Sequence, residues 1–485
     1  MASELQKIVI LHTNDIHSHY EQMPKIATAF RTLEAKHAGI PLLKIDVGDH
    51  MDRMRIATDG TDGAANIAIM NATGYHLAVP GNNEGLTFTQ EQLAVNYGRL
   101  ANFIVLGGNM GIAPDGELPS WLSSHWIQEM NGIKLGFIGV TAYYPEFYAL
   151  LNWQLHEPLS VIAQEVEALA QEVDSIVLLS HLGIAKDRQI AETIPGIDLI
   201  LGAHTHHLFE EVTLCEDTYM AAAGCFGRYI GEVELSYDRA SKKLVRIEGG
   251  SHSVEDYEMA SDITRLIENY EVQGEDRLSE TVTILEQPLT NSWKQESPLG
   301  NLLASGIREW VGAEIGLVNA GQLLGGLEEG RVTRKMLLTL CPSPINPCKF
   351  LLPGRKLLVT LEEALLDDYI NKPIKGFGFR GKILGTLCLD GIQVEYDENA
   401  VPHHKIRSVT VNGAPLQLDR HYWIGTLDMF TFGSGYLTLS EGTQTEFFLP
   451  EFLRDLLAHQ LKDSAALEGC HYRRWIKTNQ PSRLV

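Results

Sequence analysis

The sequence lacks the features that mark several special classes of protein. No stretch reaches the roughly 18 consecutive apolar residues of a membrane-spanning helix, so we expect no transmembrane segment and no membrane partner. The amino-terminal residues 1–6 have neither a basic region nor an apolar core, so we expect no secretory leader. The 6 cysteines are scattered without a Cys-x-x-Cys pair, which favours reduced thiols in a cytoplasmic protein. No internal repeat or low-complexity segment is present.

Positive charge is also scarce. The chain has 39 Lys and Arg residues against 62 Asp and Glu residues, which gives a net charge of −23. Such an acidic chain repels the phosphates of DNA and RNA, so we expect no nucleic acid polymer as a partner. Smaller anionic substrates are repelled as well. A phosphate-binding site in this chain would therefore need metal ions or a local cluster of Lys and Arg.

The length and the periodicity predict two domains, although a third is not excluded at 485 residues. Up to residue 260, apolar β-branched runs alternate with segments of helical spacing. This alternation favours a layered α/β domain in which helices sandwich two sheets. Strands are expected near residues 7–11, 41–47, 75–80, 103–107, 134–141, 175–180, 197–203, 229–237 and 244–247, and helices near 23–37, 64–73, 87–100 and 159–173.

The regular alternation of strand and helix patterns ends after residue 260. Residues 261–279 are strongly charged and place Ile263, Leu266 and Ile267 at helical spacing, so we interpret them as a helix that bridges two domains. The remainder mixes helix candidates, such as 296–311 and 357–370, with strands near 314–319, 392–396 and 406–411. We therefore expect a first domain over residues 1–260, the bridging helix, and a smaller α+β domain over residues 280–485.

Metal-ligating residue types follow five apolar runs of the first domain. In α/β domains, the loops at the carboxyl ends of strands carry the chemistry. A single Asp-x-His at such a loop is usually only a capped turn, and any one of these histidines could simply cap a strand. The recurrence across five strand ends favours a shared site instead. The seven candidate ligands are Asp15, His17, Asp49, Asn82, His181, His204 and His206.

The mixture of carboxylate, amide and imidazole groups suits Mn, Zn, Fe or Co, and the sequence does not decide among them. It fits a site for two divalent cations about 3.5–4 Å apart, with Asp49 as the natural bridging carboxylate. Such a pair lowers the pKa of a bound water and neutralises phosphoryl oxygens. The seven residues therefore predict metal-dependent hydrolysis.

The motifs of the first domain resemble those of the calcineurin-like metallophosphoesterases: Asp-x-His, Gly-Asp, Gly-Asn-x-Glu, Ser-His-Leu-Gly and Gly-Ala-His-Thr-His. More narrowly, Leu11-His-Thr-Asn-Asp-Ile-His17 resembles the opening of the 5′-nucleotidase family. The resemblance implies a four-layer αββα sandwich followed by a substrate domain. It also implies two metal sites, one held by Asp15, His17, Asp49 and His206 and the other by Asp49, Asn82, His181 and His204.

The chain departs from the family at the residues that would assist the chemistry. Where the family has a His and, three residues later, an Asp, this chain has Asn83 and Leu86. Asn83 can donate a neutral hydrogen bond to a phosphoryl oxygen but cannot deliver a proton. General acid catalysis contributes about 10²–10⁴-fold, so we expect slow turnover or a better leaving group. His50 and His207 are possible substitutes.

The nucleoside pocket of the second domain also departs from the family. The resemblance keeps Asn319 as a substrate contact, but a phosphate-binding Arg, an aromatic base-stacking residue and a ribose-binding Asp are replaced by Leu324, Ser343 and Ser434. Phe430 is a candidate for stacking a base, or else a core residue. Three cations near the lost Arg could bind anions or form a solvated run: Arg331, Arg334 and Lys335.

Three functions follow from these patterns. The first is a cytoplasmic 5′-nucleotidase-like hydrolase in nucleotide catabolism, acting on a nucleotide or another small phosphomonoester. The second is a phosphodiesterase, a pyrophosphohydrolase or a sulfur-ester hydrolase on the same two metals, because better leaving groups need no acid. The third is a catalytically weak metal-binding homologue. The sequence leaves the substrate, the metal and the oligomeric state open.

Overall fold

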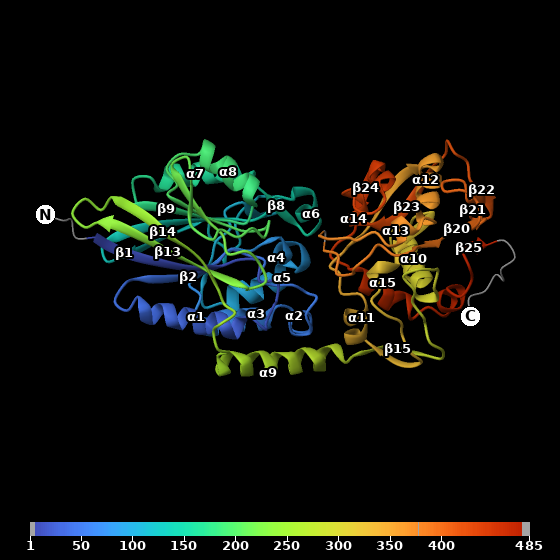
Figure 1. The fold of residues 1–485 in the computed structure, drawn as a ribbon, viewed down its shortest axis with the longest axis horizontal. Helices are drawn as coiled ribbons and strands as arrows, with labels where there is room; N and C mark the ends of the chain where they lie inside the picture. The colour runs from blue at the N-terminus through green and yellow to red at the C-terminus, as the bar shows by residue number, and fades with distance from the viewer. Residues whose placement is uncertain (1–4, 377, 478–485) are drawn as a thin grey trace. The chain divides into compact units, whose positions relative to one another are not determined.

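The computed structural model describes residues 5–376 and 378–477. Part of the amino-terminal segment on which the expectation about a leader rests, residues 1–4, lies outside this range. The chain forms two compact units, Met1–Glu275 and Asp276–Val485 (Figure 1). Every helix in the described part is too short or too polar to span a bilayer.

Two six-stranded sheets form the centre of the first unit. One has the order β14 (Leu244–Ser253), β13 (Tyr229–Asp238), β1 (Leu5–Thr13), β2 (Leu42–Asp46), β3 (Leu77–Ala78), β4 (Ile104–Val105). The other has the order β11 (Thr213–Cys215), β12 (Thr218–Ala221), β10 (Leu199–Gly202), β9 (Ser175–Ser180), β7 (Ile133–Val140), β6 (His125–Met130).

The two sheets pack face to face and are covered by helices on their outer faces. Ile10 and Ile45 of the first sheet share one buried core with Phe137 and Leu179 of the second. Helices α1 (Met23–Lys36) and α3 (Ala64–Thr73) cover one outer face, and α7 (Pro158–Leu169) and α8 (Ile184–Thr193) cover the other (Figure 1). The predicted α/β class with an αββα sandwich is therefore confirmed.

Parallel pairing explains why the candidate ligands can meet. Strand β1 pairs in parallel with β2, β2 with β3, and β9 with β10. The carboxyl ends of parallel strands lie at the same edge of a sheet, so the loops after them are neighbours. These are the loops that carry the predicted ligands.

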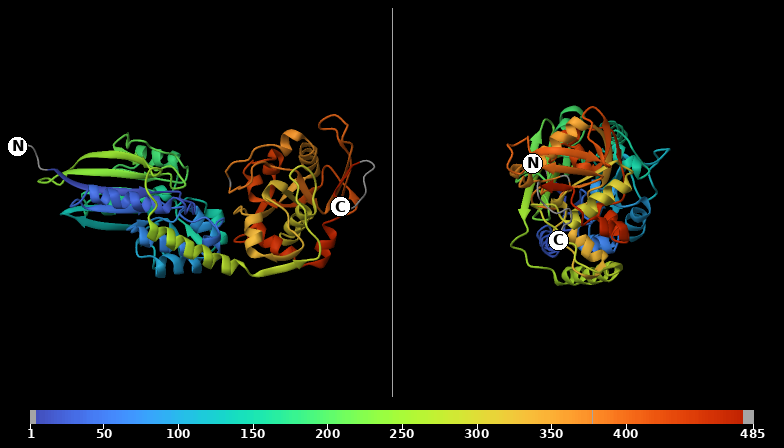
Figure 2. Two further views of the ribbon diagram at one scale, coloured as in Figure 1. Left: turned by 60° about the horizontal axis from the view of Figure 1, so that its bottom comes forward. Right: turned by 90° about the vertical axis from the view of Figure 1, so that its right-hand side faces the viewer.

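Helix α9 (Ser261–Leu278) corresponds closely to the helix expected at residues 261–279. Near its start, Asp262 forms an ion pair with Arg31 of α1 at 2.6 Å. Near its end, a Cβ atom on Gly274 would lie 2.5 Å from the backbone oxygen of Ile56, the first residue of α2 (Ile56–Gly60). The helix therefore lies across α1 and α2 (Figures 1 and 2), and the division between the units falls within its last turn.

The second unit is an α+β structure. Its main sheet has the order β19 (Leu387–Asp390), β16 (Ile315–Asn319), β23 (His421–Leu427), β18 (Pro347–Pro353), β24 (Thr443–Phe447). A smaller sheet has the order β22 (Ala414–Pro415), β21 (Ile406–Val411), β20 (Ile392–Tyr396), β25 (Trp475–Lys477), and β15 (Thr281–Leu285) pairs with β17 (Gly330–Thr333). The longer helices are α10 (Pro298–Trp310), α11 (Arg334–Leu340), α12 (Gly354–Ala364) and α15 (Leu453–Gln460).

Two expected helices are broken in the structure. In residues 87–100, α5 (Gln90–Val95) starts only after Thr89, which caps it by accepting a hydrogen bond from the backbone N–H of Gln92, and a π-helix (Asn96–Leu100) follows. Residues 357–370 contain the end of α12 and then α13 (Asp367–Ile370). Both segments keep the helical spacing of apolar residues, which is why the breaks were not anticipated.

Candidate metal centre

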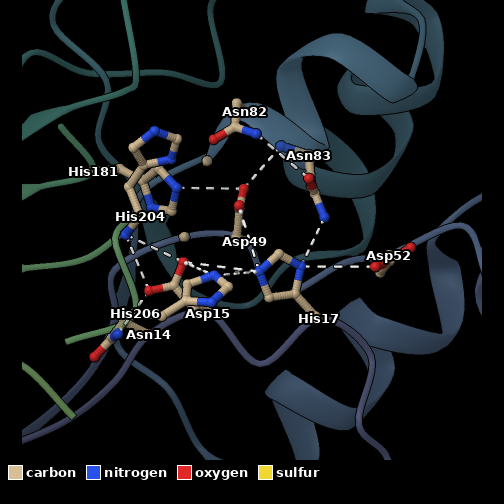
Figure 3. A network of polar contacts seen from close by, with 12 residues as sticks. Asn14, Asp15, His17, Asp49, Asp52, Asn82, Asn83, His181, His204 and His206 are labelled. Carbon is tan, nitrogen blue, oxygen red and sulfur yellow. Dashed lines mark hydrogen bonds and ion pairs between the residues drawn. The ribbon is translucent and has the colours of Figure 1, made fainter. Parts of the chain in front are cut away.

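All seven predicted ligands meet at one edge of the first unit (Figure 3). They come from the segments that follow β1, β2, β3, β9 and β10; Asn82 is the first residue of the short helix α4 (Asn82–Thr87). Most of these side chains are buried, and His206 is the exposed member. The structure thus places together residues that lie up to 191 positions apart, from Asp15 to His206.

Asp15, His17 and His206 form the first of two groups able to hold a metal ion. The Nε2 atoms of His17 and His206 are 3.1 Å apart. Asp15 Oδ1 lies 3.6 Å from Nε2 of His206 and 3.9 Å from Nε2 of His17. Three ligand atoms of suitable type therefore point to one position.

Asp49, His181 and His204 form the second group. Asp49 Oδ1 lies 3.4 Å from Nε2 of His181, while its other oxygen, Oδ2, lies 3.7 Å from Nε2 of His17 in the first group. One carboxylate therefore reaches both groups, as expected of a bridging ligand between two cations.

Two buried polar atoms at the centre have no hydrogen-bond partner among the described residues. They are Nε2 of His181 and Oδ1 of Asn82. A buried polar atom left without a partner costs about 1–3 kcal/mol, so such atoms are uncommon in proteins unless an ion, a ligand or a water binds them. Carboxylate, amide and imidazole donors of this kind suit Mn, Zn, Fe or Co. The residues present therefore fit two divalent cations.

The charged groups of the centre strongly influence one another. Burial alone would raise the pKa of Asp49, but His181 and His17 hold it well below its usual value. Burial would lower the pKa of His181, but the Asp49 carboxylate raises it to about 10. Burial and the charge of His181 lower the pKa of His204 to about 4. The carboxylates and imidazoles thus behave as one charged cluster.

The backbone is bent at most of these positions. Five of the seven ligands have a positive φ, between 48° and 71°: Asp15, His17, Asp49, His204 and His206. This left-handed region is uncommon for residues other than glycine and costs about 1–3 kcal/mol each. The fold retains this conformation at successive strand ends, where it turns the side chains toward one place. Concentrated strain of this kind is typical of functional sites.

Two glycines allow the loops to approach one another. A Cβ atom on Gly81 would lie 2.1 Å from Oδ1 of Asp49. A Cβ atom on Gly48, which has a φ of 91°, would lie 2.7 Å from Nδ1 of His181. The glycines of the Gly-Asp and Gly-Asn motifs are therefore required by close packing around the ligands.

Glu84 supports the centre in a way that the sequence analysis missed. Its side chain is fully buried and accepts hydrogen bonds from the backbone N–H groups of Asp49, Met51 and Gly81, at 2.7–3.1 Å. It therefore ties the loop after β2 to the loop after β3. Its position three residues after Gly81 is the spacing of a capping box, which was the available signal in the sequence.

Asp52 and Asn14 were also missed. Oδ2 of Asp52, which is 1% exposed, lies 3.7 Å from Nδ1 of His17 and helps to raise the pKa of that imidazole. The side-chain amide of Asn14 donates to Oδ2 of Asp15 at 2.8 Å. Both orient a ligand from outside the two groups, and no sequence spacing distinguished them from ordinary polar residues.

Asn83, which the sequence makes the candidate catalytic residue, borders the centre. Its backbone N–H donates to Oδ1 of Asp49 at 2.8 Å, and its side-chain nitrogen lies 2.8 Å from Nδ1 of His17 (Figure 3). The two possible substitutes for the missing acid have other contacts: His50 contacts Asn66, and His207 contacts Thr205.

The candidate substrate residues of the second unit are engaged in its interior. Asn319 is fully buried and donates to the backbone oxygen of Leu384, and Phe430 is fully buried in the core against Tyr436. Of the cations near Leu324, Arg331 is bonded to Thr281 and to the backbone of residue 279, and Arg334 pairs with Glu280. Neither Asn319 nor Phe430 can contact a ligand in this conformation.

Comparison with known proteins agrees with this arrangement. Residues 8–208 match the model of the calcineurin-like phosphoesterases, and residues 277–441 match that of the 5′-nucleotidase C-terminal domain. A Bacillus subtilis protein, the uncharacterized metallophosphoesterase YunD, is 36% identical over 462 residues, which cover 94% of this chain and 99% of that protein. The chain belongs to the 5′-nucleotidase family of metallophosphoesterases. Members of this family are hydrolases that act on phosphoester bonds, and the calcineurin-like phosphoesterases use two metal ions.

Two more distant similarities extend over most of the chain. The trifunctional nucleotide phosphoesterase YfkN of Bacillus subtilis is 23% identical over 496 residues, covering 91% of this chain and 33% of that protein. The solved structure of the Haemophilus influenzae NAD nucleotidase superposes with a TM-score of 0.67 at 16% identity and covers 99% of both chains. At that identity, the likeness establishes the fold alone.

Proposed function

We propose that this chain is a metal-dependent hydrolase of small phosphomonoesters, with nucleotides as the first substrates to test. The observation that carries the proposal is the meeting of two His/Asp groups through Asp49, whose two oxygens lie 3.4 Å from His181 and 3.7 Å from His17. The name of the relative YfkN, which describes a nucleotide phosphoesterase, supports the choice of nucleotides.

Asp15, His17, His206 and Asp49 would hold one cation, and Asp49, Asn82, His181 and His204 the other. When bound, such a pair supplies Lewis-acid stabilisation of phosphoryl charge and a water of lowered pKa. The chain itself supplies the bridging carboxylate, and Asn14, Asp52 and Glu84 hold the ligands and their loops in place.

The asparagine at position 83 leaves the leaving group without a general acid at this position. Its amide lies beside His17 at the edge of the centre and can donate a neutral hydrogen bond to a phosphoryl oxygen. It carries no proton that it could transfer to a leaving alkoxide. We therefore expect the reaction rate to depend strongly on the pKa of the leaving group, with phenolic and phosphate leaving groups ahead of alkoxides.

The same observation supports a second candidate function, hydrolysis of phosphodiesters or pyrophosphates. A nucleoside monophosphate is a leaving group of low pKa and departs without protonation, so the missing acid matters less there. If this alternative is correct, diesters and nucleoside diphosphates will be hydrolysed faster than nucleoside monophosphates under identical conditions.

The test uses the full chain, depleted of metal and reloaded with Mn²⁺, Zn²⁺, Fe²⁺ or Co²⁺, against a panel of mono-, di- and pyrophosphate esters. Asp49→Asn keeps the size of the side chain but removes the bridging charge. We expect it to lower activity by at least about 10³-fold and to reduce the metal content measured by elemental analysis. Asp256→Asn, at an exposed position, is the matched control. Full activity of Asp49→Asn would overturn the proposal.

A further inference from the structure

A sixth strand end reaches the metal centre, and no ligand was expected from it. Strand β7 pairs in parallel with β9, with Val140 opposite Ser180. The residues that follow Val140 therefore lie beside His181, which follows Ser180. This segment, residues 141–144, ends at Tyr144, the residue that precedes helix α6 (Pro145–Leu150).

The side chain of Tyr144 contacts a ligand of the second metal group. Its hydroxyl oxygen, Oη, lies 3.0 Å from Nε2 of His204, which is the distance of a hydrogen bond. The two rings meet edge to face, with their centroids 5.9 Å apart. Tyr144 is 39% exposed, so it borders the centre at the surface of the unit. A tyrosine hydroxyl can either donate or accept, so its role depends on the protonation of the imidazole.

Buried contacts fix the backbone from which Tyr144 projects. The backbone N–H of Thr141 donates to Oδ1 of Asn109 at 2.8 Å, and the side-chain amide of Asn109 donates back to the oxygen of Thr141 at 3.0 Å. Helix α6 packs closely on α4, since a Cβ atom on Gly85 would lie 2.3 Å from the hydroxyl oxygen of the fully buried Tyr148. The segment is therefore held against the helix that carries Asn82.

The nitrogen of a histidine that binds a metal is determined by the hydrogen bond that the other nitrogen makes. In His181, Nδ1 lies 2.6 Å from the backbone oxygen of Val47. A carbonyl oxygen only accepts, so this Nδ1 carries the proton and Nε2 is left for a cation. In His204 the arrangement is reversed. The Tyr144 hydroxyl occupies Nε2, so the nitrogen left for a cation is Nδ1.

We propose that Tyr144 is the positioning residue of His204. Its hydroxyl oxygen accepts a hydrogen bond from the Nε2–H group, which fixes the tautomer with a free Nδ1 and holds the imidazole ring in place beside Asp49 and His181. Tyr144 thus acts through His204 and supports one of the two cations, as Asp52 supports the other through His17. The inference rests on the metal pair of the proposed function.

The test compares metal binding by the full wild-type chain and by Tyr144→Phe, which removes the hydroxyl and keeps the ring. The metal-free proteins are titrated with Mn²⁺ or Zn²⁺ against a chromophoric chelator. We expect one cation to bind about tenfold more weakly and the other to change by less than about twofold. Tenfold is the lower end of the usual 10–100-fold effect of an outer partner, because the hydroxyl is neutral and partly exposed. The unfolding midpoint of the metal-free chain should stay the same.

Tyr143→Phe is the matched control. It removes the same hydroxyl from the neighbouring residue, which is 41% exposed and bonded to no residue that the structure describes, so both affinities should be those of the wild type. With Co²⁺, Tyr144→Phe alone should change the visible absorption of the bound ion, a signature of ligand orientation that a general loss of stability does not produce. In the double variant Asp52→Asn/Tyr144→Phe, both cations should bind more weakly.

The outcomes separate this inference from the proposed function. If the wild-type chain binds two cations and Tyr144→Phe binds both with unchanged affinity, the inference is wrong and the proposed function stands. Weakening of a single cation in the double variant would likewise show that Tyr144 does not act on the group of His204. If the wild-type chain binds no cation, the proposed function fails and this inference fails with it.

Discussion

Replacement of Asp52 by asparagine tests whether a residue outside the two ligand groups controls metal affinity. Asp52 is 1% exposed, and its Oδ2 atom lies 3.7 Å from Nδ1 of His17. When the Nε2 atom of a histidine binds a metal, its Nδ1 carries the proton, and a nearby carboxylate then fixes the tautomer and increases the basicity of the ring. Asp52→Asn removes the charge. It keeps the size of the side chain and an oxygen that can still accept from the backbone N–H of Met54.

The distance between Asp52 and His17 determines how large a loss of metal affinity we expect. Loss of such an outer carboxylate usually costs 10–100-fold in metal affinity. The 3.7 Å separation is longer than the 2.7–3.2 Å of a direct hydrogen bond, so we expect the lower end of that range. The predicted weakening is about tenfold, which corresponds to about 1.4 kcal/mol of binding free energy.

The assay is a competition titration of Mn²⁺ or Zn²⁺ against a chromophoric chelator, with the metal-free protein. Asp52→Asn should raise the dissociation constant about tenfold without changing the unfolding midpoint of the metal-free chain appreciably. Asp256→Asn, an exposed change of the same kind, controls for the loss of one negative charge. An unchanged dissociation constant in Asp52→Asn would show that His17 is oriented by other contacts and refute the reasoning.

Three further changes probe the centre and the fold around it. Gly81→Ala places a Cβ atom 2.1 Å from Oδ1 of Asp49 and should lower metal content and activity at least about 100-fold, as elemental analysis and turnover will show. Asn83→His combined with Leu86→Asp introduces an acid and its partner; it should speed hydrolysis of alkyl phosphates, up to 10²–10⁴-fold, while phenyl phosphates respond little. The carboxylate of Glu232 contacts His252, Lys36 and His37 at 2.5–2.8 Å. These partners hold the pKa of Glu232 below its ordinary value of 4.5, so its stabilising effect is complete above pH 4.5 and is lost as the pH falls further. Glu232→Gln should therefore cost about 2 kcal/mol at pH 7 in urea unfolding and progressively less below pH 4.5; an equal cost at both pH values would contradict the assignment.

The first unit could be predicted from sequence because its functional residues follow regular elements. Each apolar run that ends in a polar cluster marks the carboxyl end of a strand, and parallel strands bring those ends to one edge. Asp15 and His204 could therefore be placed near each other without knowledge of the intervening chain. The short loops leave little freedom in where the side chains point, so the residue types alone were informative.

The second unit was less predictable because its motifs do not follow that rule. Asn319 ends a strand and Phe430 sits in a four-residue helix, but both side chains turn into the core, and nothing in the local pattern distinguishes an inward from an outward direction at an irregular turn. The role of Asp52 could not be predicted from the sequence for the same reason. Its contact with His17 depends on how a loop folds back and not on the spacing of the two residues. Periodicity therefore identifies side chains placed by strands and helices, whereas positions set by the path of a loop need the three-dimensional structure.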